Sequence, residues 1–255
     1  LLFALPVLAQ PSGYIVTIDQ DPINADNVDA VSFTVSGAPF GSTDYQYRFS
    51  DTSGPLPPVS GSGFGGFDGV FEVSGIDLSG LADGPIILEF FMSDGSGDGP
   101  IVSDTSTKDA TPPGGYTAVI DQDPITILNQ EAVGISYTGA EVGATYVYQF
   151  TSTGGGAPVN ATGTITDANG QFAGIDLSGL ADGLISLSFT LTDPAGNVGT
   201  PVSDNTNKII HTLSIDDVTE NEGDAGAQDF TFTVSTNEGP AVNPISFSVS
   251  TQDDT

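Results

Sequence analysis

Two identical ten-residue stretches constrain this chain more than any other feature of its sequence. Residues 75–84 read Gly-Ile-Asp-Leu-Ser-Gly-Leu-Ala-Asp-Gly, and residues 174–183 repeat them letter for letter, 99 positions later. A shorter match, Ile-Asp-Gln-Asp-Pro-Ile, begins at residue 18 and again at residue 120, 102 positions later. Matches at nearly the same offset indicate two tandem units of one fold, each about a hundred residues long.

Each unit alternates apolar and polar residues with a period of two, which is typical of a strand with one buried and one solvent-facing side. In the second unit the apolar set of one such strand is Ile185, Leu187, Phe189 and Leu191. The equivalent strand of the first unit has Ile87, Glu89 and Phe91 on its outer side. This less polar side is either ordinary surface or part of a contact patch, and we favour ordinary surface.

The first unit carries seven short apolar segments separated by turn residues. We expect strands at residues 14–18, 30–36, 44–50, 58–62, 69–76, 85–93 and 101–106. In the second unit, Asn169-Gly170 predicts a hairpin turn, because this pair accepts positive φ angles. Seven strands in about 100 residues predict an immunoglobulin-like sandwich. The expected fold class is therefore all-β: tandem immunoglobulin-like β-sandwiches in an elongated rod, with a truncated third β-domain.

The charge of the chain restricts its partners. Three Lys and Arg residues face 33 Asp and Glu residues, which gives a formal net charge of −30. Such a surface repels phosphate groups, so the sequence argues against nucleic-acid binding and against docking on anionic membranes. Cations are the expected partners. With no cysteine and only one histidine, His211, the chain has no thiolate site and no site that needs two imidazoles.

Composition divides the chain into five parts. Residues 1–9 are apolar and resemble the end of a secretory signal peptide; an apolar first strand or a docking arm is the alternative. Repeat 1 is expected at 10–110, a linker at 111–115 and repeat 2 at 116–208. Residues 209–255 form a third part. No later apolar run is long enough for a membrane helix, so we expect an extracellular or cell-surface location without membrane insertion.

The repeated segments resemble a known family. The opening Ile-Asp-Gln-Asp-Pro, the run Leu-Thr-Asp-Pro-Ala-Gly-Asn at residues 191–197 and the Pro-rich linker are similar to the tandem immunoglobulin-like repeats of giant bacterial surface adhesins. The likeness covers roughly residues 12–208. It implies a stalk or extender module, whose work is to hold a distal binding region away from the cell.

The third part resembles a different family. Residues 211–224 and the run Phe-Thr-Phe-Thr-Val at 230–234 look like the opening of a Calx-β domain. The resemblance implies calcium ligands at Glu222 and Asp253. A sandwich needs about 100 residues, and residues 211–255 number 45, so we expect only the N-terminal piece of that domain.

Strand direction predicts where acidic residues gather. In a seven-stranded sandwich the turn after the first strand, the turn after the fifth strand and the end of the seventh strand share one pole. Two carboxylates about 5 Å apart repel by roughly 3 kcal/mol, and Ca²⁺ would neutralise them with loose oxygen coordination. The predicted calcium ligands at these poles are Asp19, Asp21, Asp77, Asp83, Asp109, Asp121, Asp123, Asp176 and Asp182.

Each carboxylate also has a purely structural interpretation. Asp77 and Asp176 are candidates to cap the Leu-Ser-Gly-Leu turn that follows them, and the Asp-Gly pairs at 83 and 182 are candidates for plain turns. A weaker calcium candidate is the loop between the sixth and seventh strands, with Asp94 and Asp98 in the first unit and Asp193 and Asn197 in the second. Lys108 and Lys208 are interpreted as linker residues.

Three functions remain after these exclusions. One histidine and no tryptophan argue against a serine-protease triad and against a sugar-cleaving cleft, so the favoured reading is a non-catalytic adhesin stalk stiffened by calcium. The alternatives are a filament subunit completed by strands of neighbouring chains and an accessory region of a surface enzyme. The expected partners are calcium and neighbouring repeats or other protein chains.

Overall fold

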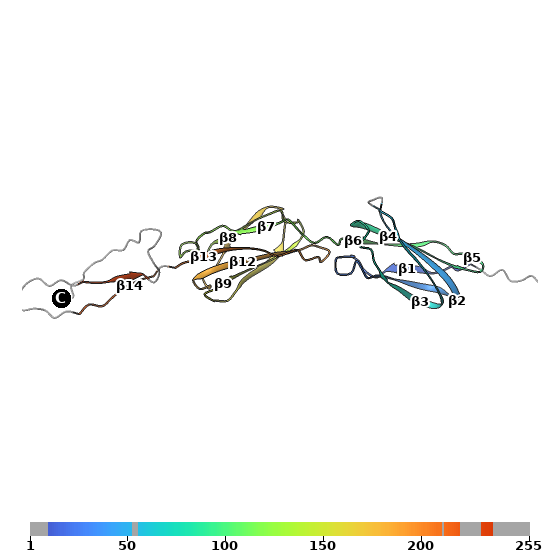
Figure 1. Cartoon of the computed structure of the whole chain (residues 1–255), viewed down its shortest axis with the longest axis horizontal. Helices are drawn as coiled ribbons and strands as arrows, with labels where there is room; N and C mark the ends of the chain where they lie inside the picture. The colour runs from blue at the N-terminus through green and yellow to red at the C-terminus, as the bar shows by residue number, and fades with distance from the viewer. Residues whose placement is uncertain (1–9, 53–55, 211, 220–230, 237–255) are drawn as a thin grey trace, which may run out of the picture.

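The computed structural model describes residues 10–52, 56–210, 212–219 and 231–236. The described residues form strands and turns and contain no helix, so none of them forms a helix that could cross a membrane. Two β-sandwiches lie end to end, and a two-stranded antiparallel sheet of β14 (Leu213–Ile215) and β15 (Val234–Thr236) follows them (Figure 1). The all-β class predicted from the alternating pattern is confirmed.

Repeat 2 is a sandwich of two antiparallel sheets. One sheet has the order β10-β9-β12-β13 and the other the order β11-β8-β7. The strands are β7 (Thr117–Ile120), β8 (Val133–Thr138), β9 (Thr145–Ser152), β10 (Val159–Thr164), β11 (Gly170–Ile175), β12 (Gly183–Thr192) and β13 (Val202–Lys208). Two packed antiparallel sheets of four and three strands are typical of immunoglobulin-like domains.

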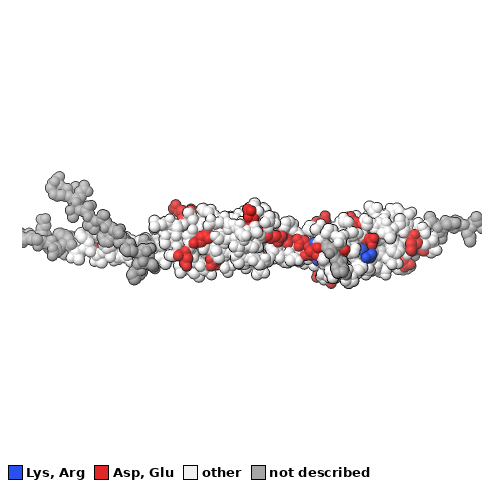
Figure 2. Space-filling model, turned by 90° about the horizontal axis from the view of Figure 1, so that it is seen from above, with Lys and Arg blue, Asp and Glu red and all other residues white. Residues whose placement is uncertain are grey.

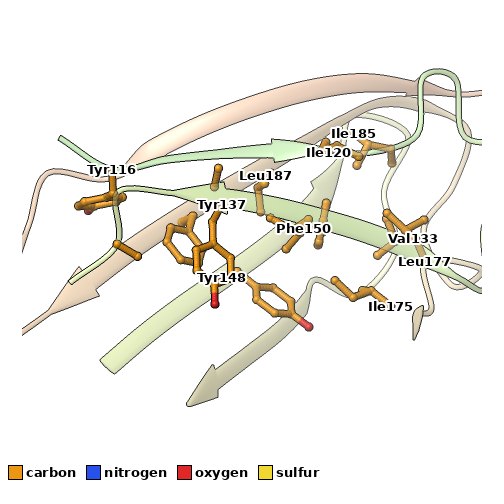
Figure 3. Packing of buried hydrophobic residues seen from close by; sticks show 14 of the residues in the cluster. Tyr116, Ile120, Val133, Tyr137, Tyr148, Phe150, Ile175, Leu177, Ile185 and Leu187 are labelled. Carbon is orange, nitrogen blue, oxygen red and sulfur yellow. The ribbon is translucent and has the colours of Figure 1, made fainter. Parts of the chain in front are cut away.

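The core of repeat 2 lies between the two sheets (Figure 3). Phe150 and Phe189 are fully buried in it. The four residues predicted for the inner side of β12, namely Ile185, Leu187, Phe189 and Leu191, are at most 1% exposed, so this prediction is confirmed. Burying a side chain of this size contributes about 1.5–3 kcal/mol relative to leaving it in water, which makes the alternation the main stabilising feature of the fold.

Repeat 1 has a different strand division. Its strands are β1 (Ile15–Ile18), β2 (Val31–Asp51), β3 (Val59–Ile76), β4 (Gly84–Asp94), β5 (Gly97–Asp98) and β6 (Val102–Lys108). All six belong to one connected antiparallel sheet. The predicted separation of 30–36 from 44–50, and of 58–62 from 69–76, is therefore wrong, because each pair is one continuous strand.

β-bulges explain the continuous strands. The pairing of β2 with β3 shifts register between Ser36 and Ala38 and again between Ala38 and Gly41. Gly37 has a φ of 72° there, a conformation that favours glycine. A bulge bends a strand, so the strand can leave one layer of a sandwich for the other while it stays paired.

In repeat 2, loops stand where repeat 1 has bulged strands, and one of these loops shows that a second prediction is wrong. The turn that contains Asn169 does not close a hairpin, because β10 pairs with β9 whereas β11 pairs with β8. This turn joins the two sheets instead. The Asn169 side chain accepts a hydrogen bond from the backbone N–H of Gly139 at 3.1 Å, which ties two neighbouring loops together.

Two sequence predictions lie outside the described residues. These are the signal-peptide remnant at 1–9 and the implied Calx-β ligands Glu222 and Asp253. They remain predictions, as do the five domain limits.

Candidate functional site: the joint between the repeats

The last strand of each repeat closes against the turn that follows the first strand. In repeat 1 the Ile23 N–H donates to the Thr107 carbonyl at 2.9 Å, and the Asp109 N–H donates to the Ile23 carbonyl at 2.8 Å. Ile23 and Lys108 form an isolated parallel bridge, and Ile125 and Lys208 repeat it in the second unit. The chain therefore leaves each repeat at a fixed place.

Asp83 holds the start of the linker. One of its carboxylate oxygens accepts from Lys108 Nζ at 2.5 Å and from the Ala110 N–H at 3.2 Å; the other accepts from the Thr111 hydroxyl at 2.6 Å. Burial alone would raise the pKa of Asp83, but these donors outweigh it and lower the pKa below the ordinary value. The carboxylate predicted as a calcium ligand is thus bound to a lysine and to the linker.

Asn197 joins the repeats directly. Its Oδ1 accepts from the Ala25 N–H of repeat 1 at 2.7 Å. Its Nδ2 donates to the carbonyl of Asp109, near the end of repeat 1, at 2.8 Å and to Asp193 Oδ2 at 2.7 Å. Asn197 is only 3% exposed, and a buried amide that uses both its oxygen and its nitrogen fixes the geometry of its partners.

A second contact crosses the joint beside the first. Asn24 Nδ2 of repeat 1 donates to the Ala195 carbonyl of repeat 2 at 2.9 Å. The intervening Gly196 has a φ of 94°, and a Cβ added there would lie 3.4 Å from Asn24 Nδ2. The positive φ therefore favours glycine for the turn of this loop, while an added Cβ would only just touch the repeat-1 side chain.

The sequence analysis assigned this loop only as a weak calcium candidate. The structure gives it a role that needs no metal, because Asp193 accepts from the Asn197 N–H at 2.8 Å and orients that residue toward repeat 1. Asn24 and Ala25 were missed altogether. Their partners lie more than 170 positions away, and no local pattern reveals a contact at that separation.

The joint concentrates negative charge. Burial raises the pKa of Glu141, and the charges of Asp193 and Asp109 raise it further. Acidic side chains are visible along the molecule, including the stretch between the two sandwiches (Figure 2). Hydrogen bonds at this place therefore act against electrostatic repulsion.

The other predicted calcium ligands are bonded to protein donors. Asp77 and Asp176 accept from the N–H groups of Ser79 and Ser178, as their capping interpretation predicts. Hydrogen bonds from the serine hydroxyls, followed by these N–H bonds, lower the pKa of each aspartate. The remaining pairs are Asp19 with Ser32 and Thr34, Asp21 with Ser106 and Thr107, Asp121 with Gln171, Asp123 with Thr206, and Asp182 with the Ile210 N–H. Within the described ranges, no three acidic or histidine side chains form a group that could hold a metal. As calcium ligands these residues remain predictions.

Lys108 and Lys208 are not linker residues. They are 4% and 2% exposed, and both end the last strand of their repeat. Lys208 Nζ donates to the carbonyls of Leu177 at 2.9 Å, Leu180 at 2.5 Å and Ser178 at 3.4 Å. These carbonyls belong to the stretch that is identical in both units. The signal was present in the sequence, because two of its three Lys and Arg residues lie 100 positions apart, at equivalent places in the two units.

The fold defines a tandem pair of immunoglobulin-like β-sandwiches. Solved structures similar to it include a tetra-tandem repeat in the extending region of a large adhesion protein, at 22% identity and a TM-score of 0.34, covering 81% of this chain and 51% of that one. Another is a Ca²⁺-stabilised adhesin that helps an Antarctic bacterium reach out and bind ice, at 19% identity and a TM-score of 0.42, covering 80% and 52%. A third is a segment of two fibronectin type-III domains from chicken tenascin, at 13% identity and a TM-score of 0.32, covering 78% and 99%.

The chain spans about half the length of the first two structures. No known protein family and no curated protein matches the sequence. Because every identity is below 25% and every TM-score below 0.5, the function assigned below depends on the chain's own geometry.

Proposed function

We propose that this chain is a non-catalytic stalk segment of a secreted or cell-surface bacterial adhesin, which holds a binding region away from the cell. The observation that carries the proposal is the joint. Asn197 bonds to two places in repeat 1, Ala25 and Asp109, and to Asp193 of its own repeat. Contacts of this kind restrict the angle between sandwiches, and the Pro-rich linker adds stiffness. Restricted joints let tandem modules extend in one direction.

Charge supports the same function. A net charge of −30 opposes the folding back of one sandwich against another, because like charges repel over several ångströms. Lys108 and Lys208 are buried, so most of the few cations cannot bridge acidic surfaces. An extended arrangement keeps the carboxylates farthest apart.

Calcium is the second part of the proposal. Glu141 is affected by the negative charges of Asp193 and Asp109, and Ca²⁺ prefers carboxylate and carbonyl oxygens in loose geometry. The described residues hold no ready group of three acidic side chains, so an ion at the joint would also take backbone carbonyls or water as ligands. Calcium binding there would remove the repulsion and add to the stiffness that the hydrogen bonds of Asn197 already supply.

Small-angle scattering and thermal unfolding of the full chain test both parts. We expect a maximum dimension that corresponds to sandwiches placed end to end; a compact, side-by-side arrangement would overturn the stalk proposal. The measurements are then repeated in millimolar Ca²⁺ and in excess EDTA. Calcium stiffening predicts that chelation lowers the melting temperature and shortens the maximum dimension. If neither value changes, the calcium part is wrong and the stalk is a passive spacer.

A further inference from the structure

Repeat 1 carries a groove on the outer side of its sheet. The hollow has a volume of about 470 Å³ and lies across β3, β2 and β4. Phe91 and Ile101 supply its apolar part, while Gln46, Arg48 and Glu89 supply polar groups. Sites for small ligands are commonly about 300–1,000 Å³ and combine apolar surface with a few polar groups.

Repeat 2 provides an internal reference for this surface. In repeat 1 Arg48 lies opposite Glu89 and Gln46 lies opposite Phe91. In repeat 2 the equivalent pairs are Gln149 with Ser188 and Val147 with Thr190. The strand positions match because the identical stretches before β4 and β12 fix the offset at 99 residues.

Comparing the two repeats shows which side chains on this outer side the fold does not require. Repeat 2 builds the same outer side without an aromatic residue or a charge at the positions of Phe91, Arg48 and Glu89. The sandwich therefore does not need these side chains. The prediction that the outer side of β4 is ordinary surface leaves their presence in repeat 1 unexplained.

The polar groups of the groove are available to a ligand. Arg48 and Glu89 approach to 3.5 Å, with side chains that are 53% and 44% exposed. An exposed pair at this distance contributes about 0–1 kcal/mol, so a ligand that inserts between the two groups loses little. Guanidinium, carboxylate and the amide of Gln46 together offer several donors and acceptors within one groove.

We propose that this groove binds a neutral carbohydrate. Each sugar hydroxyl both donates and accepts, which suits the mixed set of Arg48, Glu89 and Gln46. The apolar C–H face of a sugar ring can pack on Phe91, because aromatic rings bury large area and attract C–H groups at their face. The inference goes beyond the stalk function and does not depend on it.

Charge argues against two other occupants of the groove, an anionic polymer and a second copy of the chain. The groove holds one positive and one negative side chain, whereas the chain as a whole carries −30. An anionic polymer would be repelled by that field. A second copy of the chain would bring another −30 and needs about 800 Å² of matching surface per partner for a standard interface.

The test uses the full chain and neutral hexasaccharides of glucose, mannose and N-acetylglucosamine. Binding is measured by calorimetry and by chemical-shift changes in NMR spectra. Phe91→Thr and the double variant Arg48→Gln with Glu89→Ser install the residues of repeat 2. Ile15→Thr is the matched control: it removes an exposed apolar side chain elsewhere in repeat 1 and installs the equivalent residue of repeat 2, Thr117.

We expect at least one hexasaccharide to bind, with shift changes confined to the groove, and at least a tenfold loss of affinity in both groove variants but not in the control. Absence of binding at millimolar sugar would overturn the proposal, and so would binding that is equal in wild type and Phe91→Thr. Concentration-dependent association that requires Phe91 would assign the groove to a second copy instead. The shift map of the wild type decides the site even if a variant fails to fold.

Discussion

Replacement of Asn197 by alanine tests how the joint is held. The substitution removes the bonds to the Ala25 N–H and to the Asp109 carbonyl. Each such bond contributes about 0.5–1.5 kcal/mol net, so together they favour the docked joint by about 2 kcal/mol, or roughly 30-fold. We expect Asn197→Ala to change one fixed inter-repeat angle into a broad range of angles.

The assay is a distance measurement between two spin labels. The chain contains no cysteine, so Thr105→Cys in β6 and Ser188→Cys in β12 create the only attachment points. Both positions are exposed, one in each repeat. The wild type is expected to give a narrow distance distribution and Asn197→Ala a broad one.

Two further variants separate the joint from general damage. Asn24→Ala removes the bond to the Ala195 carbonyl without touching Asp193. Because one bond across the joint is lost instead of two, the docked joint is expected to lose about half as much free energy as in Asn197→Ala, and the distance distribution to broaden less. Asn205→Ala is the control, because Asn205 is exposed and lies within β13, where it pairs with Ser186 of its own repeat. A narrow distribution in Asn197→Ala, with unchanged melting temperature, would refute the proposed mechanism.

Three other perturbations have defined outcomes. Lys208→Met leaves buried carbonyls without their donor and is expected to destabilise repeat 2 by about 2–4 kcal/mol in urea unfolding. The control Arg48→Gln changes an exposed residue and is expected to alter stability by no more than about 0.5 kcal/mol. Equal effects of the two variants would contradict the structural role of the buried lysine. Glu141 has a raised pKa, so the native state binds more protons than the unfolded state between the two pKa values, and stability falls as pH rises through that interval. Glu141→Gln is therefore expected to raise the melting temperature at pH 7 and to lose this advantage near pH 4; a lower melting temperature at pH 7 would show that Glu141 stabilises the joint instead. Trypsin is expected to leave the native chain intact, because Lys108 and Lys208 are buried and Arg48 lies in a strand paired on both sides, while the unfolded chain is cut at all three cations. Rapid native cleavage after Lys108 would mean that the linker opens readily.

The periodic part of the fold could be predicted from sequence because its cause is local. Ile185, Leu187 and Phe189 alternate with polar residues, and that alternation alone decides which side of β12 is buried. The bulged strand β2 could not be predicted in the same way. Gly37 and Gly41 look like loop residues, and only the partner strand β3 decides that pairing continues through them.

The contacts at the joint were harder to predict from the sequence, for a different reason. Strand direction correctly brought Asp21, Asp83 and the end of β6 to one pole, where both carboxylates contact residues of the 106–111 segment. The identity of their partners depends on side-chain placement to within a few tenths of an ångström. Whether an aspartate binds a lysine, a serine or a metal depends on that placement, and the spacing of residues along the sequence does not reveal it.

The parallel bridge between Ile23 and Lys108 has a mechanical consequence. Tension applied along the chain would pull each repeat by the beginning of its first strand and the end of its last strand. In a parallel arrangement these two ends point in opposite directions, so the Ile23–Thr107 and Ile23–Asp109 hydrogen bonds are loaded together in shear. Ile125 repeats the arrangement with Asn207 and Ile209. Each sandwich would thus resist stretching with hydrogen bonds that bear the force together, instead of breaking one after another.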